Sequence, residues 1–233
     1  MKLLANNKNK KVILNTKMPV LSPESSFSMI EAFKAIRTNL IFSLASQNKR
    51  MVLLTSALPG EGKTTTSVNL ALSMAQTGAK VLLIDADLRK PMVHKALNLK
   101  NDLGLSEVLG GFCKLLKALK YEVAENLDVL TSGAIPPNPA ELLSSEAMMA
   151  FLDYCKENYD YIFFDTPPVN VVADALALAP LVSGVLLVVK EQKTLHPEFK
   201  KAIAGIEFSG TKILGIVLNA SQSSIKKGYR YKY

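Results

Sequence analysis

The chain has 233 residues, 48% of them apolar, and a formal net charge of +8. This length and composition suit one folded domain and argue against wholesale disorder. No apolar run approaches the roughly 18–20 residues that a membrane-spanning helix needs, and the N-terminal lysines precede only Val12-Ile13-Leu14, which is too short for a signal peptide. We therefore expect a cytosolic protein.

The positive charge lies at the two ends of the sequence. Residues 1–20 contain five lysines and residues 221–233 contain three lysines and one arginine, both without any acid, whereas residues 21–220 carry a net charge of −1. A nucleic-acid-binding protein more often has a basic folded body, so we expect no nucleic-acid partner. The basic ends are either solvated tails or weak attachments to an anionic membrane surface.

The two cysteines, Cys113 and Cys155, are far apart and lack CxxC spacing. They therefore predict neither a disulfide scaffold nor a zinc or iron–sulfur site.

Hydrophobic periodicity predicts one helix over about 25–44 and then strands that alternate with helices. The expected strands are the short apolar runs at 51–55, 81–84, 127–131, 161–164, 184–189 and 212–218, and the expected main helices lie at 64–76, 141–156 and 197–208. Strands that are apolar on both faces indicate a mainly parallel sheet covered by helices on both sides. In such a sheet the ligand site lies beyond the carboxyl ends of the strands.

A phosphate-binding loop follows the first expected strand. The segment SALPGEGKT, residues 56–64, lies between that strand and a helix, and is a Walker A loop with Ala57 in place of its first glycine. Its glycines let backbone N–H groups face phosphate oxygens, and the helix N-terminus adds its dipole. Lys63 is expected to reach the β- and γ-phosphates of ATP, and the Thr64 hydroxyl to bind Mg²⁺. The expected nucleotide-binding residues are Pro59, Gly60, Glu61, Gly62, Lys63, Thr64 and Thr65. This motif makes the expected fold a three-layer P-loop NTPase fold with a mainly parallel central sheet.

Three aspartates stand at the ends of two other expected strands. Asp85 and Asp87 follow VLLI, and Asp165 follows YIFF. A single aspartate after a strand is usually a turn or cap residue. Three aspartates in the same sheet as a phosphate loop instead predict a site for Mg²⁺ and its water ligands. A phosphate-bound Mg²⁺ needs only one or two protein carboxylates nearby.

The segments LPGEGKTTT, LLIDADLRKP and IFFDTPP, with IPPNPAELL between the last two, resemble the bacterial tyrosine kinases of capsule and exopolysaccharide systems. The similarity runs from about Met18 to the C-terminus. These kinases are similar in fold to the ParA/MinD-type ATPases, and the three segments match their Walker A, A′ and B motifs. Because the sequence has no internal repeat and no low-complexity linker, we expect a flexible basic tail at 1–20, one P-loop kinase domain at 21–220 and a flexible tyrosine-rich tail at 221–233.

The resemblance also implies roles for the site residues, with Lys63, Asp85, Asp87 and Asp165 as the catalytic set. Lys63 neutralises phosphate charge, and Thr64 binds Mg²⁺ directly. Asp85 orients the incoming tyrosine hydroxyl; because a free aspartate is far less basic than phenolate, we interpret it as a late proton acceptor. Asp87 and Asp165 hold the coordination shell of the metal, and the expected metal-site residues are Thr64, Asp85 and Asp165.

Arg89 and Asn219 are two further candidate site residues. Arg89 contacts either phosphate or a neighbouring chain, and the sequence leaves that choice open. Asn219, after the last strand, is a candidate adenine contact by fold analogy.

Position 58 distinguishes this chain from the ParA/MinD-type ATPases. Those proteins carry a lysine at the start of the loop that reaches the nucleotide of a dimer partner, and here the position is Leu58. The main prediction is thus a tyrosine kinase that transfers phosphate from Mg·ATP to its own tail. Two alternatives remain: a MinD-like ATPase switch, and an ATP-dependent scaffold for polysaccharide assembly.

The two ends of the chain carry the remaining predictions. The resemblance marks the tail tyrosines Tyr229, Tyr231 and Tyr233 as the autophosphorylation sites; a frayed edge strand is the alternative. Glu31, Lys34 and Arg37 resemble the family's ExxRxxR interface motif, with a lysine in place of the middle arginine, and a solvated helix face is the alternative.

The family further implies several partners. They are a homo-oligomeric ring, a separate transmembrane adaptor that recruits the kinase to the inner face of the membrane, and a cognate tyrosine phosphatase.

Overall fold

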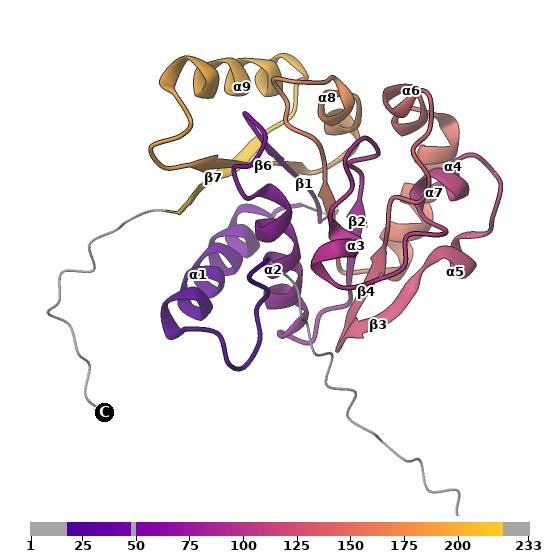
Figure 1. The fold of residues 1–233 in the computed structure, drawn as a ribbon, viewed down its shortest axis with the longest axis horizontal. Coiled ribbons are helices and arrows are strands. Elements are labelled where there is room, and N and C mark those ends of the chain that lie inside the picture. Colours follow the sequence, from indigo (N-terminus) through magenta and orange to yellow (C-terminus); the bar gives the residue numbers. More distant parts are fainter. Residues whose placement is uncertain (1–17, 48–49, 221–233) are drawn as a thin grey trace, which may run out of the picture.

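One seven-stranded sheet forms the centre of the molecule (Figure 1). The computed structural model describes residues 18–47 and 50–220. The strands are β1 (Met51–Ser56), β2 (Val81–Asp85), β3 (Lys120–Ala124), β4 (Leu127–Leu130), β5 (Tyr161–Asp165), β6 (Gly184–Lys190) and β7 (Ile213–Asn219). Their order across the sheet is β3-β4-β2-β5-β1-β6-β7, and every neighbouring pair is parallel except β3 and β4. The predicted mainly parallel sheet is confirmed.

Helices cover both faces of this sheet and give the predicted three layers (Figure 1). One face carries α1 (Phe27–Ser43), α2 (Lys63–Ala75) and α3 (Val93–Ala96). The other carries α4 (Leu105–Leu109), α5 (Leu115–Ala118), α6 (Pro139–Leu143), α7 (Glu146–Asn158), α8 (Asp174–Leu178) with the short 3₁₀ helix η1 (Ala179–Leu181), and α9 (His196–Phe208). Within the described residues, no helix is both long and apolar enough to cross a bilayer.

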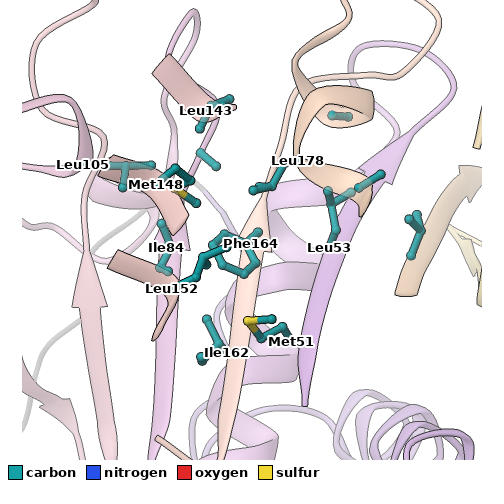
Figure 2. Packing of buried hydrophobic residues seen from close by; sticks show 14 of the residues in the cluster. Met51, Leu53, Ile84, Leu105, Leu143, Met148, Leu152, Ile162, Phe164 and Leu178 are labelled. Atoms are coloured by element: carbon teal, nitrogen blue, oxygen red, sulfur yellow. The ribbon is translucent and has the colours of Figure 1, made fainter. Parts of the chain in front are cut away.

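Two hydrophobic cores result from the alternation of side chains along each central strand. In β5, Ile162 and Phe164 point to the α4–α9 side, and Tyr161 and Phe163 to the α1–α3 side. Figure 2 shows Phe164 between Ile84, Leu152 and Met51 in the first core. Because both faces are buried, the central strands are continuously apolar in sequence, which is why their positions are predictable.

Besides adding the short helices α3, α4, α5 and α8, the structure differs from the sequence prediction at one expected helix and one strand. The helix expected over 141–156 is two helices, because Ser145 begins a new one by accepting a hydrogen bond from the Met148 amide. The antiparallel edge strand β3 was not predicted, because Lys120, Tyr121 and Glu122 lack an apolar pattern and are partly or fully exposed.

Candidate active site

The phosphate loop connects β1 to α2, as predicted, and α2 begins at Lys63. Gly60 and Gly62 have φ angles of 76° and 90°, in the left-handed region that favours glycine. A Cβ atom on Gly62 would lie 1.8 Å from the side-chain nitrogen of Asn219. Both the conformation and the space at this position therefore require glycine, and the backbone remains open for phosphate.

Residues far away in sequence hold this loop from outside. The Glu61 side chain is buried and accepts hydrogen bonds from the Leu58 amide (3.0 Å) and from the Thr194 hydroxyl. The Lys193 ammonium donates to the Pro59 carbonyl at 2.9 Å. Sequence reasoning missed Lys193 and Thr194, because no motif marks the β6–α9 loop. The Glu61 side chain is directed toward this supporting loop, and the predicted nucleotide contact of Glu61 through its backbone stays a prediction.

Asn219 also supports the phosphate loop. Its side-chain amide donates to the Glu61 carbonyl at 2.9 Å, and its side-chain oxygen accepts from the Ala220 amide at 2.8 Å. The sequence suggested an adenine contact here; the described contacts of Asn219 are with the protein backbone. The end of β7 therefore lies against the phosphate loop.

Asp165 is the centre of the polar cluster beside the loop. Its fully buried carboxylate receives the Lys63 ammonium at 2.7 Å, the Thr64 hydroxyl at 2.7 Å and the Ser67 hydroxyl at 2.9 Å. Lys63 also lies 3.7 Å from a carboxylate oxygen of Asp87. Four predicted site residues thus meet at the carboxyl ends of β1, β2 and β5. Ser67 was not predicted, although its position one helical turn after Lys63 places it on the same side of α2.

Asp85 lies directly opposite Asp165 in the register of β2 and β5. Its fully buried carboxylate accepts backbone N–H bonds from Asp87 (3.2 Å), Met92 (3.1 Å) and Val93 (3.0 Å), which close the loop after β2. Burial, followed by the charge of Asp165, raises the pKa of Asp85 to about 8, against the opposing effects of the Lys63 charge and the Val93 hydrogen bond.

Asp87 is the aspartate of the Walker A′ loop that reaches the cleft surface. Its side chain is 11% exposed, and burial raises its pKa while the Lys63 charge opposes that rise. Asp85, by contrast, has no exposed surface. A ligand in the cleft therefore meets Asp87 first, with Asp85 behind it.

The cleft beside this cluster has a volume of about 530 Å³, within the range of small-molecule sites. It is lined by the phosphate loop from Pro59 to Thr65, by the loop after β2, and by residues 167–172 after β5. Arg89, on the loop after β2, forms a two-point ion pair with the fully buried Asp174 at the start of α8, with distances of 2.8 and 3.0 Å. In this structure Arg89 is thus anchored within its own chain.

The oxygen atoms of the site suit Mg²⁺ held jointly with a nucleotide. Among the described residues, no group of three or more His, Cys, Asp or Glu side chains forms a metal site by itself. Mg²⁺ commonly keeps several waters and binds through one or two carboxylates plus substrate phosphates. The Thr64 hydroxyl donates to Asp165, and Lys63 lies beside both Asp165 and Asp87, so these oxygen atoms form a donor set of that kind.

The predicted interface residues lie on α1, away from the cleft. Lys34 pairs with Glu31 at 2.8 Å on the exposed face of the helix. Arg37 instead turns toward α2 and donates to the Ser73 carbonyl at 2.6 Å. The three side chains therefore do not project as one group. The predicted tyrosines at 229, 231 and 233 lie outside the described residues.

Comparison with known proteins decides the family. A family model described as an AAA domain matches residues 49–198. The tyrosine-protein kinase YwqD of Bacillus subtilis (strain 168) is 45% identical over 86% of this chain and 85% of its own length. The chain belongs to the bacterial tyrosine kinases. The predicted family and enzyme class, a protein-tyrosine kinase, are thereby confirmed.

Other relatives extend this assignment. A putative tyrosine-protein kinase in the cps region of Klebsiella pneumoniae is 35% identical over 93% of this chain, which spans 30% of that longer protein. The solved kinase domain of the Escherichia coli tyrosine kinase ETK has a TM-score of 0.81 at 36% identity, covering 88% of this chain and 80% of that one. Relatives of this kinase therefore include proteins in which the kinase is one part of a larger chain.

The kinase also shares its P-loop fold with cell-division ATPases. The septum site-determining protein MinD of Pyrococcus horikoshii, solved with Mg-ADP, has a TM-score of 0.62 at 26% identity over 73% of this chain and 70% of that one. The predicted likeness to MinD is confirmed. Leu58 occupies the position at which the sequence analysis expects a lysine in ParA/MinD-type ATPases. Its side chain is partly buried and packs on the core of the α4–α9 face.

Proposed function

We propose that this tyrosine kinase transfers the γ-phosphoryl group of Mg·ATP to Tyr229, Tyr231 and Tyr233 of its own C-terminal tail, and so regulates synthesis and export of a capsular or exopolysaccharide. The proposal rests mainly on the Lys63–Asp165 cluster, which lies beside a phosphate loop in a chain of the tyrosine kinase family. A relative named for a cps region supports the polysaccharide context.

In the proposed transfer, the tyrosine oxygen attacks the γ-phosphorus in line with the β–γ bridging oxygen. The new bond joins the phenol oxygen to phosphorus, the bond to the bridging oxygen breaks, ADP leaves, and the phenol loses its proton. The N–H groups of the phosphate loop and Lys63 would hold the phosphates, and Thr64, Asp87 and Asp165, which lie around Lys63, would hold Mg²⁺. Bound Mg²⁺ would stabilise charge on the transferring group.

Proton transfer is assigned to Asp85, the last residue of β2, and to Asp87 in the loop that follows. The raised pKa of Asp85, about 8, lies closer to that of a phenol, near 10, than the pKa of a free aspartate does. Three backbone N–H groups hold Asp85 behind the cleft surface. We propose that the ionised form of Asp85, which a bound Mg²⁺ would favour, orients the tyrosine and accepts its proton late, with Asp87 at the cleft surface next to it.

The position of β7 supports transfer to the tail. Asn219, at the end of this strand, touches the phosphate loop. The nine residues from 221 to 229 span at most about 30–32 Å when extended. The first tail tyrosine is therefore within reach of its own cleft or of one on a neighbouring chain, and the family resemblance favours a neighbour within a ring.

We further propose that partners act on this kinase at the membrane. The basic residues at both chain ends support attraction to an anionic surface. A transmembrane adaptor would recruit and activate the kinase on the inner face of the membrane, and a tyrosine phosphatase would reverse the reaction. The exposed Glu31–Lys34 pair belongs to the proposed ring interface.

A MinD-like ATPase switch is the second candidate, supported by the shared fold. Parallel measurement of ADP release and phosphotyrosine in the purified full chain with Mg·ATP and the adaptor segment separates the two. The kinase proposal predicts phosphotyrosine that disappears when all three tail tyrosines are replaced by phenylalanine. Steady ADP release without phosphotyrosine would favour the switch. A third candidate, the scaffold, would gain support if Asp85→Asn lost phosphotyrosine but kept polysaccharide output.

A further inference from the structure

Part of the cleft lies beyond the position expected for the ATP phosphates. An attacking group must approach the γ-phosphorus from the side opposite the leaving oxygen. The Lys63–Asp165 cluster marks the position of the γ-phosphate, and from there the cleft continues along the loops after β2 and β5. This part of the cleft is therefore the approach side for the acceptor.

The approach side has an apolar wall. Met92 comes from the loop after β2, and Pro168, Val171 and Val172 come from the loop after β5. Met92 is 37% exposed and Val171 is 55% exposed, so both present apolar surface to solvent. Such a surface offers no advantage to a triphosphate, whereas the ring of a tyrosine gains free energy by covering it.

Backbone hydrogen bonds define the position of the loop after β5. The Val169 amide donates to the Ser56 carbonyl at 2.9 Å and ties this loop to β1, and a turn joins the Val171 amide to the Pro168 carbonyl at 3.1 Å. The wall thus has a defined shape before any ligand binds, which lowers the entropy cost of binding.

The Arg89–Asp174 ion pair connects the two loops that carry the wall. Arg89 follows β2, Asp174 follows the loop after β5, and the guanidinium makes two bonds to the fully buried carboxylate. A two-point contact of this kind fixes direction as well as distance. It therefore sets the spacing between Met92 on one loop and the valines on the other.

We propose that Met92, Pro168, Val171 and Val172 bind the aromatic ring of the acceptor tyrosine, supplied by the C-terminal tail, and that Arg89 and Asp174 are positioning residues for this wall. This inference rests on the proposed function. A ring on the wall directs its hydroxyl toward Asp87 and the γ-phosphate, whereas the short side chain of serine cannot touch the wall and reach the phosphate together. The wall would thus select tyrosine as the acceptor.

The test measures binding of the ring without requiring phosphoryl transfer. Fluorescently labelled peptides with the sequence of residues 226–233 carry either phenylalanine or alanine in place of all three tyrosines. They are titrated by anisotropy into the full chain loaded with Mg·ADP, in which Tyr229→Ala, Tyr231→Ala and Tyr233→Ala remove competition from its own tail. The proposal predicts at least about tenfold tighter binding of the phenylalanine peptide.

Variants of the wall and a matched control complete the test. Met92→Ser and Val171→Ser should each remove most of the preference for phenylalanine while keeping the affinity for ADP. Met149→Ser, which changes a similarly exposed methionine on α7, should keep the preference. Asp174→Asn should weaken peptide binding with unchanged ADP affinity, and Asp174→Glu should restore part of it.

Two results would overturn the inference: equal affinity for the two peptides, or an undiminished preference in both wall variants. Failure of the proposed function would look different. In that case the wild-type chain with Mg·ATP would form no phosphotyrosine, whatever the peptides show. A wall that binds phenylalanine in a chain without transfer activity would therefore contradict only the proposed function.

Discussion

At the scale of single residues, one carboxylate organises the candidate site. The Asp165 carboxylate accepts hydrogen bonds from Lys63, Thr64 and Ser67 at 2.7 to 2.9 Å. Helix α2, which carries these three residues, and strand β5, which carries Asp165, are about a hundred residues apart in sequence. Lys63 and Thr64 are the residues expected to hold phosphate and Mg²⁺. Their positions therefore depend on the charge of Asp165.

We predict that Asp165→Asn lowers the rate of phosphotyrosine formation by at least about 100-fold, because the site loses a metal-binding charge and the partner of Lys63. Ser67→Ala, which removes a single bond to the same carboxylate, should cost less than about tenfold. The rates are measured with purified chains at saturating Mg·ATP. Equal losses in the two variants would show that the charge of Asp165 is not the decisive property.

The raised pKa of Asp85 predicts a pH-dependent stability. The folded-state pKa of about 8 exceeds the usual 3.8, so the folded state keeps a proton that the unfolded state has lost. The stability contribution of this group therefore falls as the pH rises from about 4 to about 8.

Asp85→Asn should remove this slope. Without nucleotide and Mg²⁺, the free energy of unfolding of the wild type should fall between pH 6 and pH 8 to 9, whereas that of the variant should not. The difference between the two proteins should therefore shift in favour of the variant by on the order of 2 kcal/mol over this pH range. Thermal unfolding at each pH measures the difference. An unchanged slope in the variant would mean that Asp85 is already ionised at pH 6.

At the scale of elements, the sequence specified the sheet and the phosphate loop better than the contacts around them. Strands buried on both faces are continuously apolar, so β1, β2, β5 and β6 were predictable from local pattern. The support of the loop by Lys193 and Thr194 was not, since these residues are more than 130 positions away from their partners. Only the folded sheet brings β6 next to β1.

Thr194→Val tests this support. The variant loses the bonds of the hydroxyl to the Glu61 carboxylate and from the Lys190 amide. Because a buried carboxylate is then left with fewer donors, we expect roughly 1–3 kcal/mol less stability and a weaker affinity for ADP. Calorimetric unfolding and ADP titration measure the two effects. A variant with lower stability but wild-type ADP affinity would limit the role of Thr194 to folding.

Helix α1 offers a contrast between two of its own residues. Arg37 bonds to the Ser73 carbonyl of α2, whereas Lys34 pairs only with Glu31 on the exposed face. Arg37→Ala should lower stability by about 1–2 kcal/mol, and Lys34→Ala by less than about 0.5 kcal/mol.

Thermal unfolding together with light scattering separates folding from assembly in these two variants. If α1 forms the proposed ring interface, Lys34→Ala should reduce the oligomer without lowering the unfolding temperature. A smaller oligomer only in Arg37→Ala would instead assign the effect to the packing of α1 on α2.

At the scale of the whole molecule, the strand order brings the site residues together. The order β2-β5-β1-β6-β7 places three aspartates, a phosphate loop and the end of β7 at one edge of the sheet. The tail tyrosines were predicted from the sequence and from the family resemblance, and they lie outside the described residues. The acceptor is therefore the part of the account that most needs a direct measurement.

That measurement is site mapping of phosphotyrosine by mass spectrometry. The purified full chain is incubated with Mg·ATP and the cytosolic segment of its adaptor, beside a Lys63→Met variant as the inactive control. We predict phosphate on Tyr229, Tyr231 and Tyr233 in the wild type and none in the variant. ATP hydrolysis by the wild type with no phosphate on these three tyrosines would contradict the account.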